Sequence, residues 1–157
     1  MDVIELDKAS AGEILTLQRA AFALDCAVNF PGYTAPVEQT LAQLREEMEK
    51  PDSRAFGIRD AHRLVAAVRI RRTGQESVYL GRLSVAPDRQ GEGLGGTLLQ
   101  AVHTAIPGLF PEAVRIDISV EGDNTPLVDW YRKRGYVVTR EGTERSEYEW
   151  TMARPIA

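Results

Sequence analysis

The sequence predicts an α/β fold with a mixed, mostly antiparallel sheet of about six to seven strands and about four flanking helices. Three observations indicate this class. Short segments rich in strand formers recur along the chain between turn residues. Two of the turns, at residues 60–62 and 73–75, have the size of hairpin connections, so the strands that they join should be antiparallel. A later connection passes through a helical segment, so its two strands should be parallel.

The N-terminal part is predicted to hold one strand and a first helix. Residues 3–6 form the strand, and Ser10 should cap the helix, with Glu13 completing a capping box. Apolar residues then recur at helical spacing, so one face should be buried. That face carries Ile14, Leu17, Ala21 and Leu24.

A second helix is predicted from about Val37 to Pro51, after residues 25–36, which lack helical periodicity and carry the aromatics Phe30 and Tyr33. Its expected buried face holds Val37, Leu41, Leu44 and Met48, and its expected solvated face holds Arg45, Glu46, Glu47 and Lys50.

The remaining elements alternate between strands and helices. Residues 53–59, 63–71, 76–85, 113–120, 136–138 and 146–152 are the predicted strands. A helix after the third of these should bury Leu94, Leu98, Val102 and Ala105 and stop at Pro107. Pro126 should open the last helix and Gly135 should close it.

The connection from strand 76–85 to the next helix has the composition of an anion-binding loop. It runs through Gln90, Gly91, Glu92, Gly93, Leu94, Gly95 and Gly96. Glycines permit positive φ and let backbone N–H groups approach a ligand closely. At a helix N-terminus these donors add to the positive end of the macrodipole. The loop should therefore hold an anion, and phosphate is the ligand that suits it.

Two nucleotide-binding motifs compete for this loop. Residues 91–96 also satisfy G-x-G-x-x-G, with Asp117 near the place of a ribose-binding acid. However, several strands precede the motif and too few residues follow it for a doubly wound sheet, which disfavours a nicotinamide-dependent oxidoreductase. No Lys-Ser/Thr pair follows the glycines, so the P-loop interpretation fails.

Two motifs together resemble the GCN5-related N-acetyltransferase (GNAT) superfamily. The pattern Gln90-x-x-Gly93-x-Gly95, after a strand that ends in Val85-x-Pro87, is similar to the family's pyrophosphate loop. Asn124, followed by Tyr131 and then by residues 132–136, looks like the family's N…YxxxGF segment. The resemblance covers nearly the whole chain and implies a single GNAT domain, residues 1–157, with splayed central strands.

The resemblance also implies acetyl-coenzyme A as a co-substrate, and no metal. Backbone amides of residues 90–96, helped by the Gln90 side chain, would bind its pyrophosphate. Its pantetheine arm would enter between strands 76–85 and 113–120 and pair with the backbone of Leu83, Ser84 and Val85. The Val85 N–H would face the oxyanion, and Asn124 would contact the cofactor near its thioester.

The implied reaction is direct attack of a primary amine on the thioester, without an acyl-enzyme. Tyr131 matches the family's general acid, which protonates the departing thiolate. The base stays open, because Ser77 and Ser119 occupy the places of the glutamate in many relatives. Three carboxylates are nearby in sequence: Glu76, Asp117 and Glu121. Cys26 is not needed as a nucleophile.

The composition of the chain limits the classes of molecule that it is expected to bind. The chain has 157 residues, a net charge of −4 and a single cysteine, so nucleic acid, anionic membranes and an intramolecular disulfide are not expected. The lack of a signal segment or a long apolar run favours a cytoplasmic enzyme. His62 and His103 are expected to be solvated. The acceptor, a small molecule or a peptide, stays open, as do a homodimer and a catalytically inactive acyl-coenzyme A sensor.

Overall fold

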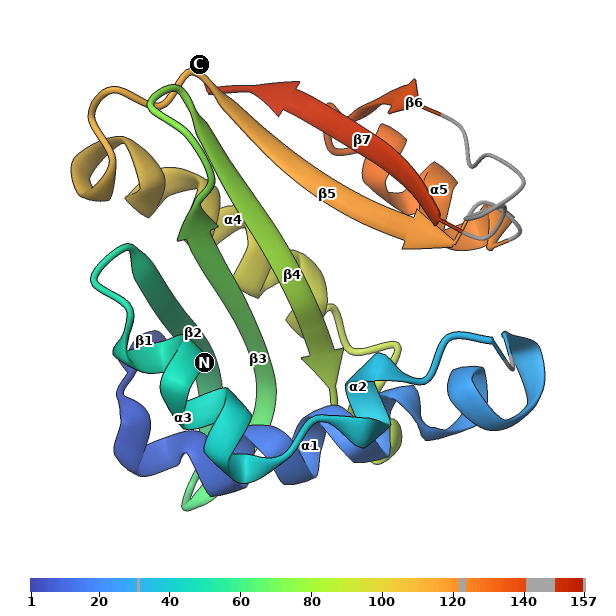
Figure 1. The fold of residues 1–157 in the computed structure, drawn as a ribbon. Helices are drawn as coiled ribbons and strands as arrows, with labels where there is room; N and C mark the ends of the chain where they lie inside the picture. The colour runs from blue at the N-terminus through green and yellow to red at the C-terminus, as the bar shows by residue number, and fades with distance from the viewer. Residues whose placement is uncertain (31, 122–123, 141–148, 157) are drawn as a thin grey trace.

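The computed structural model describes residues 1–30, 32–121, 124–140 and 149–156. Among them the chain forms a seven-stranded sheet in the order β1-β2-β3-β4-β5-β7-β6, and β4–β5 is its one parallel pair (Figure 1). The strands are β1 (Val3–Leu6), β2 (Ser53–Asp60), β3 (Arg63–Arg72), β4 (Ser77–Val85), β5 (Arg115–Glu121), β6 (Val137–Arg140) and β7 (Glu149–Pro155). The predicted fold class is confirmed.

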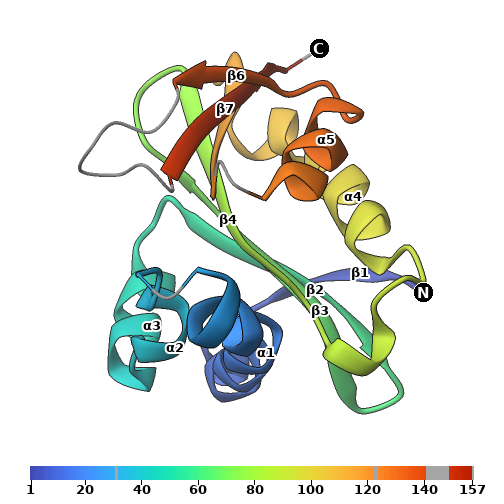
Figure 2. The ribbon, with the colours of Figure 1, turned by 90° about the vertical axis from the view of Figure 1, so that its right-hand side faces the viewer.

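Helices cover both faces of the sheet (Figure 2). On one face lie α1 (Ala11–Leu24), α2 (Ala35–Glu38) and α3 (Leu41–Glu49), and on the other lie α4 (Leu94–Leu109) and α5 (Thr125–Arg132). The sheet is therefore the middle of three layers.

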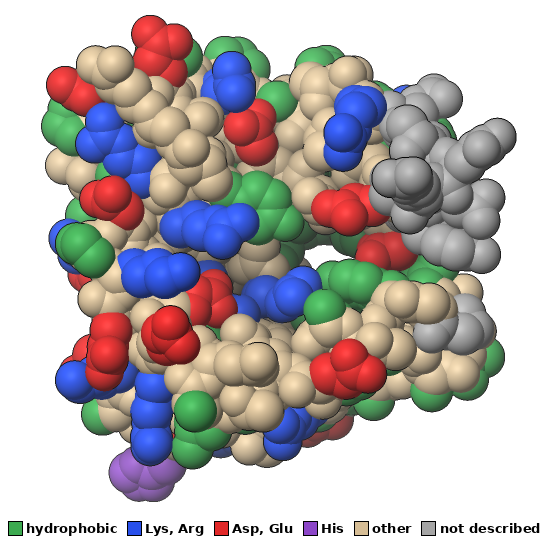
Figure 3. All heavy atoms as spheres, viewed as in Figure 1, with side chains coloured by type: hydrophobic (Ala, Val, Ile, Leu, Met, Phe, Trp, Pro, Cys, Tyr) green, Lys and Arg blue, Asp and Glu red, His purple; other side chains and the backbone are tan. Residues whose placement is uncertain are grey.

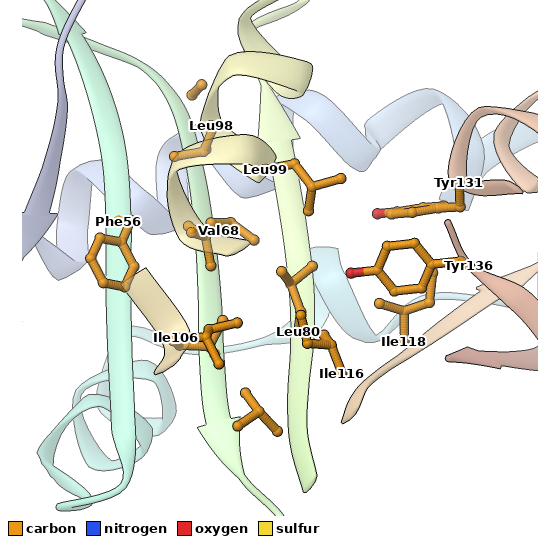
Figure 4. Close-up of a cluster of buried hydrophobic side chains, with 14 of the residues drawn as sticks. Phe56, Val68, Leu80, Leu98, Leu99, Ile106, Ile116, Ile118, Tyr131 and Tyr136 are labelled. Atoms are coloured by element: carbon orange, nitrogen blue, oxygen red, sulfur yellow. The ribbon is translucent and has the colours of Figure 1, made fainter. Parts of the chain in front are cut away.

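The main hydrophobic core fixes α4 to the sheet. Leu98, Leu99 and Ile106 of α4 are at most 1% exposed. They pack in one cluster with Val68 of β3 and Leu80 of β4 (Figure 4). Burial of each such side chain contributes roughly 1.5–3 kcal/mol. This packing holds the N-terminus of α4 beside the end of β4.

The parallel strands β4 and β5 pair over a short stretch and then diverge. Their register runs from Ser77 opposite Arg115 to Tyr79 opposite Asp117 and ends there. Beyond it, β5 keeps its antiparallel partner β7 as far as Glu121. The predicted splay of the central strands is present, and Figure 1 shows the two strands separating toward their C-terminal ends.

A bulge in β4 lies beside this divergence. The register with β3 shifts between Ala67 and Arg69, opposite residues 81–84 of β4. Within this stretch Arg82 has φ of +55°, in the left-handed region that non-glycine residues rarely adopt. Such strain is retained where the surroundings fix it and is common at functional sites.

The predicted capping box of the first helix is wrong. Ser10 is the N-cap residue of α1 but makes no side-chain capping bond. Instead, the guanidinium of Arg59 binds the side chains of both capping-box residues and donates to Ser10 Oγ at 3.2 Å and to Glu13 Oε2 at 2.7 Å. On the predicted buried face, Ile14 and Leu17 are buried, but Leu24 is 64% exposed because it lies at the end of the helix.

The predicted second helix is two helices. The chain leaves the helix at Gln39, and Thr40 and Gln43 then form a capping box that opens α3. Of the predicted buried face, Leu44 is fully buried. Glu47, predicted to be solvated, is half-buried because it pairs with Arg69 at 3.1 Å.

Two predictions about the α4 region are also wrong. The helix continues through Pro107 to Leu109, since the Phe110 N–H still bonds to the Ile106 carbonyl at 2.8 Å. Its buried face includes Leu94, Leu98 and Val102, but Ile106 takes the buried place expected for Ala105.

His103 is not a solvated histidine. It lies half-buried on α4 and its ring contacts the Tyr136 hydroxyl at 2.8 Å and an Arg154 nitrogen at 2.7 Å. His62 is exposed in the turn between β2 and β3, as predicted. The first residues of the predicted last strand, 146–148, lie outside the described residues.

Candidate active site

The glycine-rich loop joins the end of β4 to the start of α4. Gly91 and Gly93 have φ of +83° and +82°, where a Cβ is strained. Gly93 is the N-cap residue, and the first helical bond runs from the Thr97 N–H to its carbonyl at 3.0 Å. The N–H groups of residues 94–96 therefore have no partner within the helix. Backbone donors and the helix dipole make this loop a suitable cradle for a phosphate.

The side chains of the loop have partners of their own. Arg89 donates to Glu92 at 2.8 Å and to Asp60 at 2.7 Å, which ties Glu92 to the protein. The Gln90 side chain is exposed and reaches the Val85 carbonyl at 3.4 Å. The loop therefore offers backbone rather than anionic side chains to a ligand.

Arg134, which follows α5, lies beside the start of α4. Its guanidinium stacks on Trp130, 3.6 Å from the ring centroid, and donates to the Trp130 carbonyl at 2.9 Å. A Cβ built on Gly96 would lie 3.2 Å from Arg134 Nη2, so Gly96 leaves the room that the guanidinium needs. Sequence analysis missed this cation because α5 and α4 meet only in the folded chain.

A cavity of about 470 Å³ occupies the opening between β4 and β5. Its walls come from β4, β5, α5 and the segment between α1 and α2, and Figure 3 shows the opening on one face of the molecule. Leu83, Ser119, Glu121 and Tyr131 are among the lining residues. The divergence of the strands therefore produces a slot with polar groups on its walls.

Tyr131 of α5 lines this cavity. The residue is 6% exposed, and its ring packs against Trp130 and Tyr136. Figure 4 shows its hydroxyl pointing away from α5 toward β4. Within the described residues this hydroxyl has no hydrogen-bond partner, and burial raises its pKa above the usual range. A protonated hydroxyl thus faces the slot.

Asn124 is the N-cap residue of α5. Its side-chain oxygen accepts a bond from the Leu127 N–H at 3.3 Å. This bond orients the first turn of the helix that carries Tyr131. Among the described residues the amide nitrogen of Asn124 has no hydrogen-bond partner.

Val85 turns its backbone toward the opening. The Ala86 N–H bonds to the Val65 carbonyl on β3 at 2.9 Å. Because successive amides of a strand point to opposite edges, the Val85 N–H points to the β5 side, where β5 has already diverged. Ser84, by contrast, is 2% exposed and donates its hydroxyl to the Arg82 carbonyl at 3.0 Å.

Glu121, at the end of β5, is one of two carboxylates that line the cavity from the sheet, and Glu149 of β7 is the other. Its pKa is raised to about 7, mainly because burial penalises its charge, with Asp25 and Glu149 adding repulsion. Asp117 does not line the slot and pairs with Arg115 at 3.1 Å. Glu76 is exposed before β4, and Ser77 is buried where β4 and β5 still pair. Of the three carboxylates left open by the sequence, Glu121 alone lies in the slot.

The segment between α1 and α2 forms one wall. Cys26 is buried in a π-helical turn, Asp25–Asn29, as expected of a packing residue. Phe30 is also buried and does not line the slot, whereas Tyr33 does.

Among the described residues no group of three or more His, Cys, Asp or Glu could hold a metal ion. In that same part of the chain no helix is long and apolar enough to cross a membrane.

A glycine-rich turn at the end of one strand of a split parallel pair is the arrangement typical of the GNAT fold. The model of the Acetyltransferase (GNAT) domain family matches residues 27–153. The chain therefore belongs to the GNAT N-acetyltransferase family.

A curated relative supports this assignment. The "uncharacterized N-acetyltransferase YesJ" of Bacillus subtilis (strain 168) is 42% identical over 62 residues, which are 40% of this chain and 33% of that protein. The match thus spans about a third of the length of that relative.

Solved structures share the fold over nearly the whole chain. The PaiA N-acetyltransferase of Thermoplasma acidophilum, in complex with coenzyme A, has a TM-score of 0.80 at 16% identity over 98% of each chain. The ribosomal-protein-S18-alanine N-acetyltransferase of Escherichia coli has a TM-score of 0.76 at 16% identity, covering 99% and 94% of the chains. The aminoglycoside 6'-acetyltransferase type Ii has a TM-score of 0.76 at 17% sequence identity, and the match covers 100% of this chain and 98% of that one.

Proposed function

We propose that residues 1–157 are a single domain that transfers an acetyl group from acetyl-coenzyme A to a primary amine by direct attack. The observation that carries the proposal is the Tyr131 hydroxyl, which faces the slot between β4 and β5 and has no hydrogen-bond partner among the described residues. The glycine turn at the end of the same strand lies where it could hold the diphosphate of the donor.

The cofactor site would consist of backbone donors around the slot. Residues 90–96 would cradle the pyrophosphate, because Gly91 and Gly93 adopt positive φ and have open space around them. Leu83, Ser84 and Val85 would pair with the pantetheine arm along the unpaired edge of β4. Asn124 would contact the donor near its thioester. PaiA of Thermoplasma acidophilum was solved with coenzyme A, which supports this assignment.

The described groups suit the two proton transfers of the reaction. An alkylammonium has an ordinary pKa near 10 and must lose a proton before it attacks. Glu121, with its pKa raised to about 7, is suited to accept that proton directly or through water. The Val85 N–H would stabilise the oxyanion. As the C–N bond forms and the C–S bond breaks, Tyr131 would give its proton to the thiolate.

Two measurements test the proposal. Acetyl-coenzyme A should raise the melting temperature of the purified chain, whereas NAD(H) should not. Release of free coenzyme A should then depend on the presence of an amine. Stabilisation by NAD(H) alone would contradict the cofactor assignment. Binding without thiol release for every amine of a broad panel would favour an acyl-coenzyme A sensor.

A further inference from the structure

A second cavity, of about 480 Å³, lies on the face of the sheet beside α3 and adjoins the slot at three shared residues. Tyr79, Gly81 and Arg82 of β4 line both spaces. The Tyr79 ring lies across Gly81, since a Cβ at Gly81 would be 2.8 Å from ring atom Cε1. The second cavity and the slot therefore meet at Tyr79, Gly81 and Arg82.

The second cavity is lined by several cations, most of which have acidic partners. Figure 3 shows Lys and Arg side chains across the middle of this face. Arg54 pairs with Glu5 at 2.7 Å. Arg69 is 7% exposed and is bound to Gln18 at 2.9 Å and to Glu47 at 3.1 Å, so it is a structural residue.

Arg71 and Arg82 differ from these cations. Within the described part of the chain neither lies within salt-bridge distance of a carboxylate. Arg71 is exposed and stacks on Tyr79, 5.1 Å from the ring centroid. Arg82 is half-buried and held by a 2.8 Å bond from its Nη1 to the Tyr33 hydroxyl. Both guanidiniums keep donors for an anionic ligand.

The backbone at Arg82 favours a binding role over a structural one. Its φ of +55° is strained for a residue with a Cβ, and a glycine there would relieve the strain. The conformation places a guanidinium at the junction of the two cavities. A guanidinium at this junction would attract an anionic group of the acceptor and repel a cationic group from the second cavity.

We propose that the acceptor is an amine that also bears a carboxylate, an amino acid or short peptide, and that Arg82 and Arg71 bind the carboxylate in the second cavity. This inference rests on the proposed acetyl transfer. The amine would then point toward Glu121 and Tyr131 in the slot, so opposite ends of the acceptor meet opposite charges. Guanidinium groups suit this role because they bind carboxylates through paired donors.

The test compares matched acceptors. Rates of thiol release are measured with glycine, β-alanine, 4-aminobutyrate and glycylglycine, with the amide of each, and with spermidine. We expect kcat/KM to be at least about tenfold higher for the best acid than for its amide, as the loss of one charge-assisted contact predicts. The preference should fall to near unity in Arg82→Gln and fall severalfold in Arg71→Gln. Arg82→Lys should keep part of it.

Controls separate this inference from the proposed function. Arg115→Gln changes an exposed arginine on β5, at the end far from Glu121, and should leave the preference intact. Amides or spermidine acetylated as well as the acids, or a preference unchanged in both arginine variants, would overturn the inference and leave acetyl transfer standing.

A binding readout covers the case in which catalysis itself fails. With coenzyme A present, N-acetylated acids should raise the melting temperature of the wild-type chain more than their N-acetylated amides do. Arg82→Gln should abolish this difference. Equal stabilisation by acids and amides would overturn the carboxylate site whatever the outcome of the turnover assay.

Discussion

The Tyr33 hydroxyl accepts a 2.8 Å hydrogen bond from Arg82 Nη1 and so ties the segment between α1 and α2 to the bulge of β4. Burial raises the pKa of Tyr33 to about 12, so the phenol stays neutral and does not ion-pair with Arg82. Tyr33 thus positions the guanidinium without neutralising it, and Arg82 keeps its charge for a ligand.

Tyr33→Phe should therefore weaken acceptor binding without touching the cofactor. We expect the KM for a carboxylate-bearing amine to rise about fivefold, the loss of roughly 1 kcal/mol for one hydrogen bond. The Kd for acetyl-coenzyme A, measured by calorimetry, should stay near the wild-type value. In a double-mutant cycle with Arg82→Gln the two effects should not add, because they break one arrangement. Full additivity would contradict the positioning role.

Tyr131→Phe should reduce kcat by about a hundredfold, within the range for loss of a general acid. The ring is 6% exposed and packed on both sides, so the variant should fold, and acetyl-coenzyme A should bind normally. Tyr136→Phe is the matched control, because its hydroxyl contacts His103 on α4. It should cost about 1 kcal/mol of stability and leave kcat unchanged. Normal turnover in folded Tyr131→Phe would remove this tyrosine from the mechanism.

Glu121→Gln should abolish the activity that depends on a base with a pKa near 7. The folded-state pKa is raised to about 7, so the basic form is gained as pH rises through that value. The ratio of wild-type to variant kcat/KM should rise between pH 6 and 8 and then level off, which cancels the titration of the amine itself. A ratio that is constant with pH would assign the base elsewhere.

The same carboxyl gives a readout independent of turnover. Its pKa is higher folded than unfolded, so it stabilises the fold below its ordinary pKa of 4.5 and this contribution is lost as pH rises toward 7. Glu121→Gln, which cannot ionise, should therefore melt higher than the wild-type chain at pH 8. Asp117→Asn, at a carboxylate paired with Arg115 outside the slot, should not raise the melting temperature.

Gly93→Ala should destabilise the fold and weaken donor binding together. The residue adopts φ of +82° at the N-cap of α4, a conformation that costs an alanine about 1–2 kcal/mol. We expect a lower melting temperature and a Kd for acetyl-coenzyme A raised about tenfold. Gly12→Ala is the control, since Gly12 lies in α1 with open space around it and should gain about 0.5–1 kcal/mol. Unchanged binding by Gly93→Ala would place the diphosphate elsewhere.

The sequence correctly predicts those parts of the fold whose structure depends on residues close together along the chain. The strand, glycine turn and helix from Tyr79 to Val102 form as their local composition indicates. The capping box at Ser10 fails because Arg59, far along the chain, binds both of its side chains. Glu47 is half-buried for a similar reason, its pairing with Arg69. Side chains with strong distant partners override local patterns.

The residues of the candidate site differ in the same way, since some follow from local motifs and others are placed only by the folded chain. Tyr131 and the glycine turn follow from motifs whose residues are close in sequence. Glu121 could not be separated from Glu76 and Asp117, because only the point where β4 and β5 part decides which carboxylate faces the slot. The position of Arg82 depends on a bulge in β4. The sequence does not indicate this bulge at residue 82, because the residue with positive φ there is an arginine and not a glycine.

His103 should make the fold lose stability as pH falls from about 6.5 to 4. Arg154 can only donate, so its Nη1 at 2.7 Å fixes Nδ1 as the acceptor, and Nε2 then donates to the Tyr136 hydroxyl. Protonating Nδ1 would set two donors against each other. Burial and the Arg154 charge accordingly lower the pKa of His103 to about 4.

The sign of the effect follows from linkage. Above pH 6.5 the His103 imidazole is neutral in both the folded and the unfolded chain. Below pH 6.5 the imidazole of the unfolded chain binds a proton, whereas that of the folded chain stays neutral until about pH 4. Urea midpoints measured from pH 7.5 to 4.5 should therefore fall more steeply for the wild-type chain than for His103→Gln. The exposed His62 provides the control, and His62→Gln should keep the wild-type slope. Equal slopes for His103→Gln and wild type would show that the folded imidazole accepts a proton, and the Arg154 bond would then have to break.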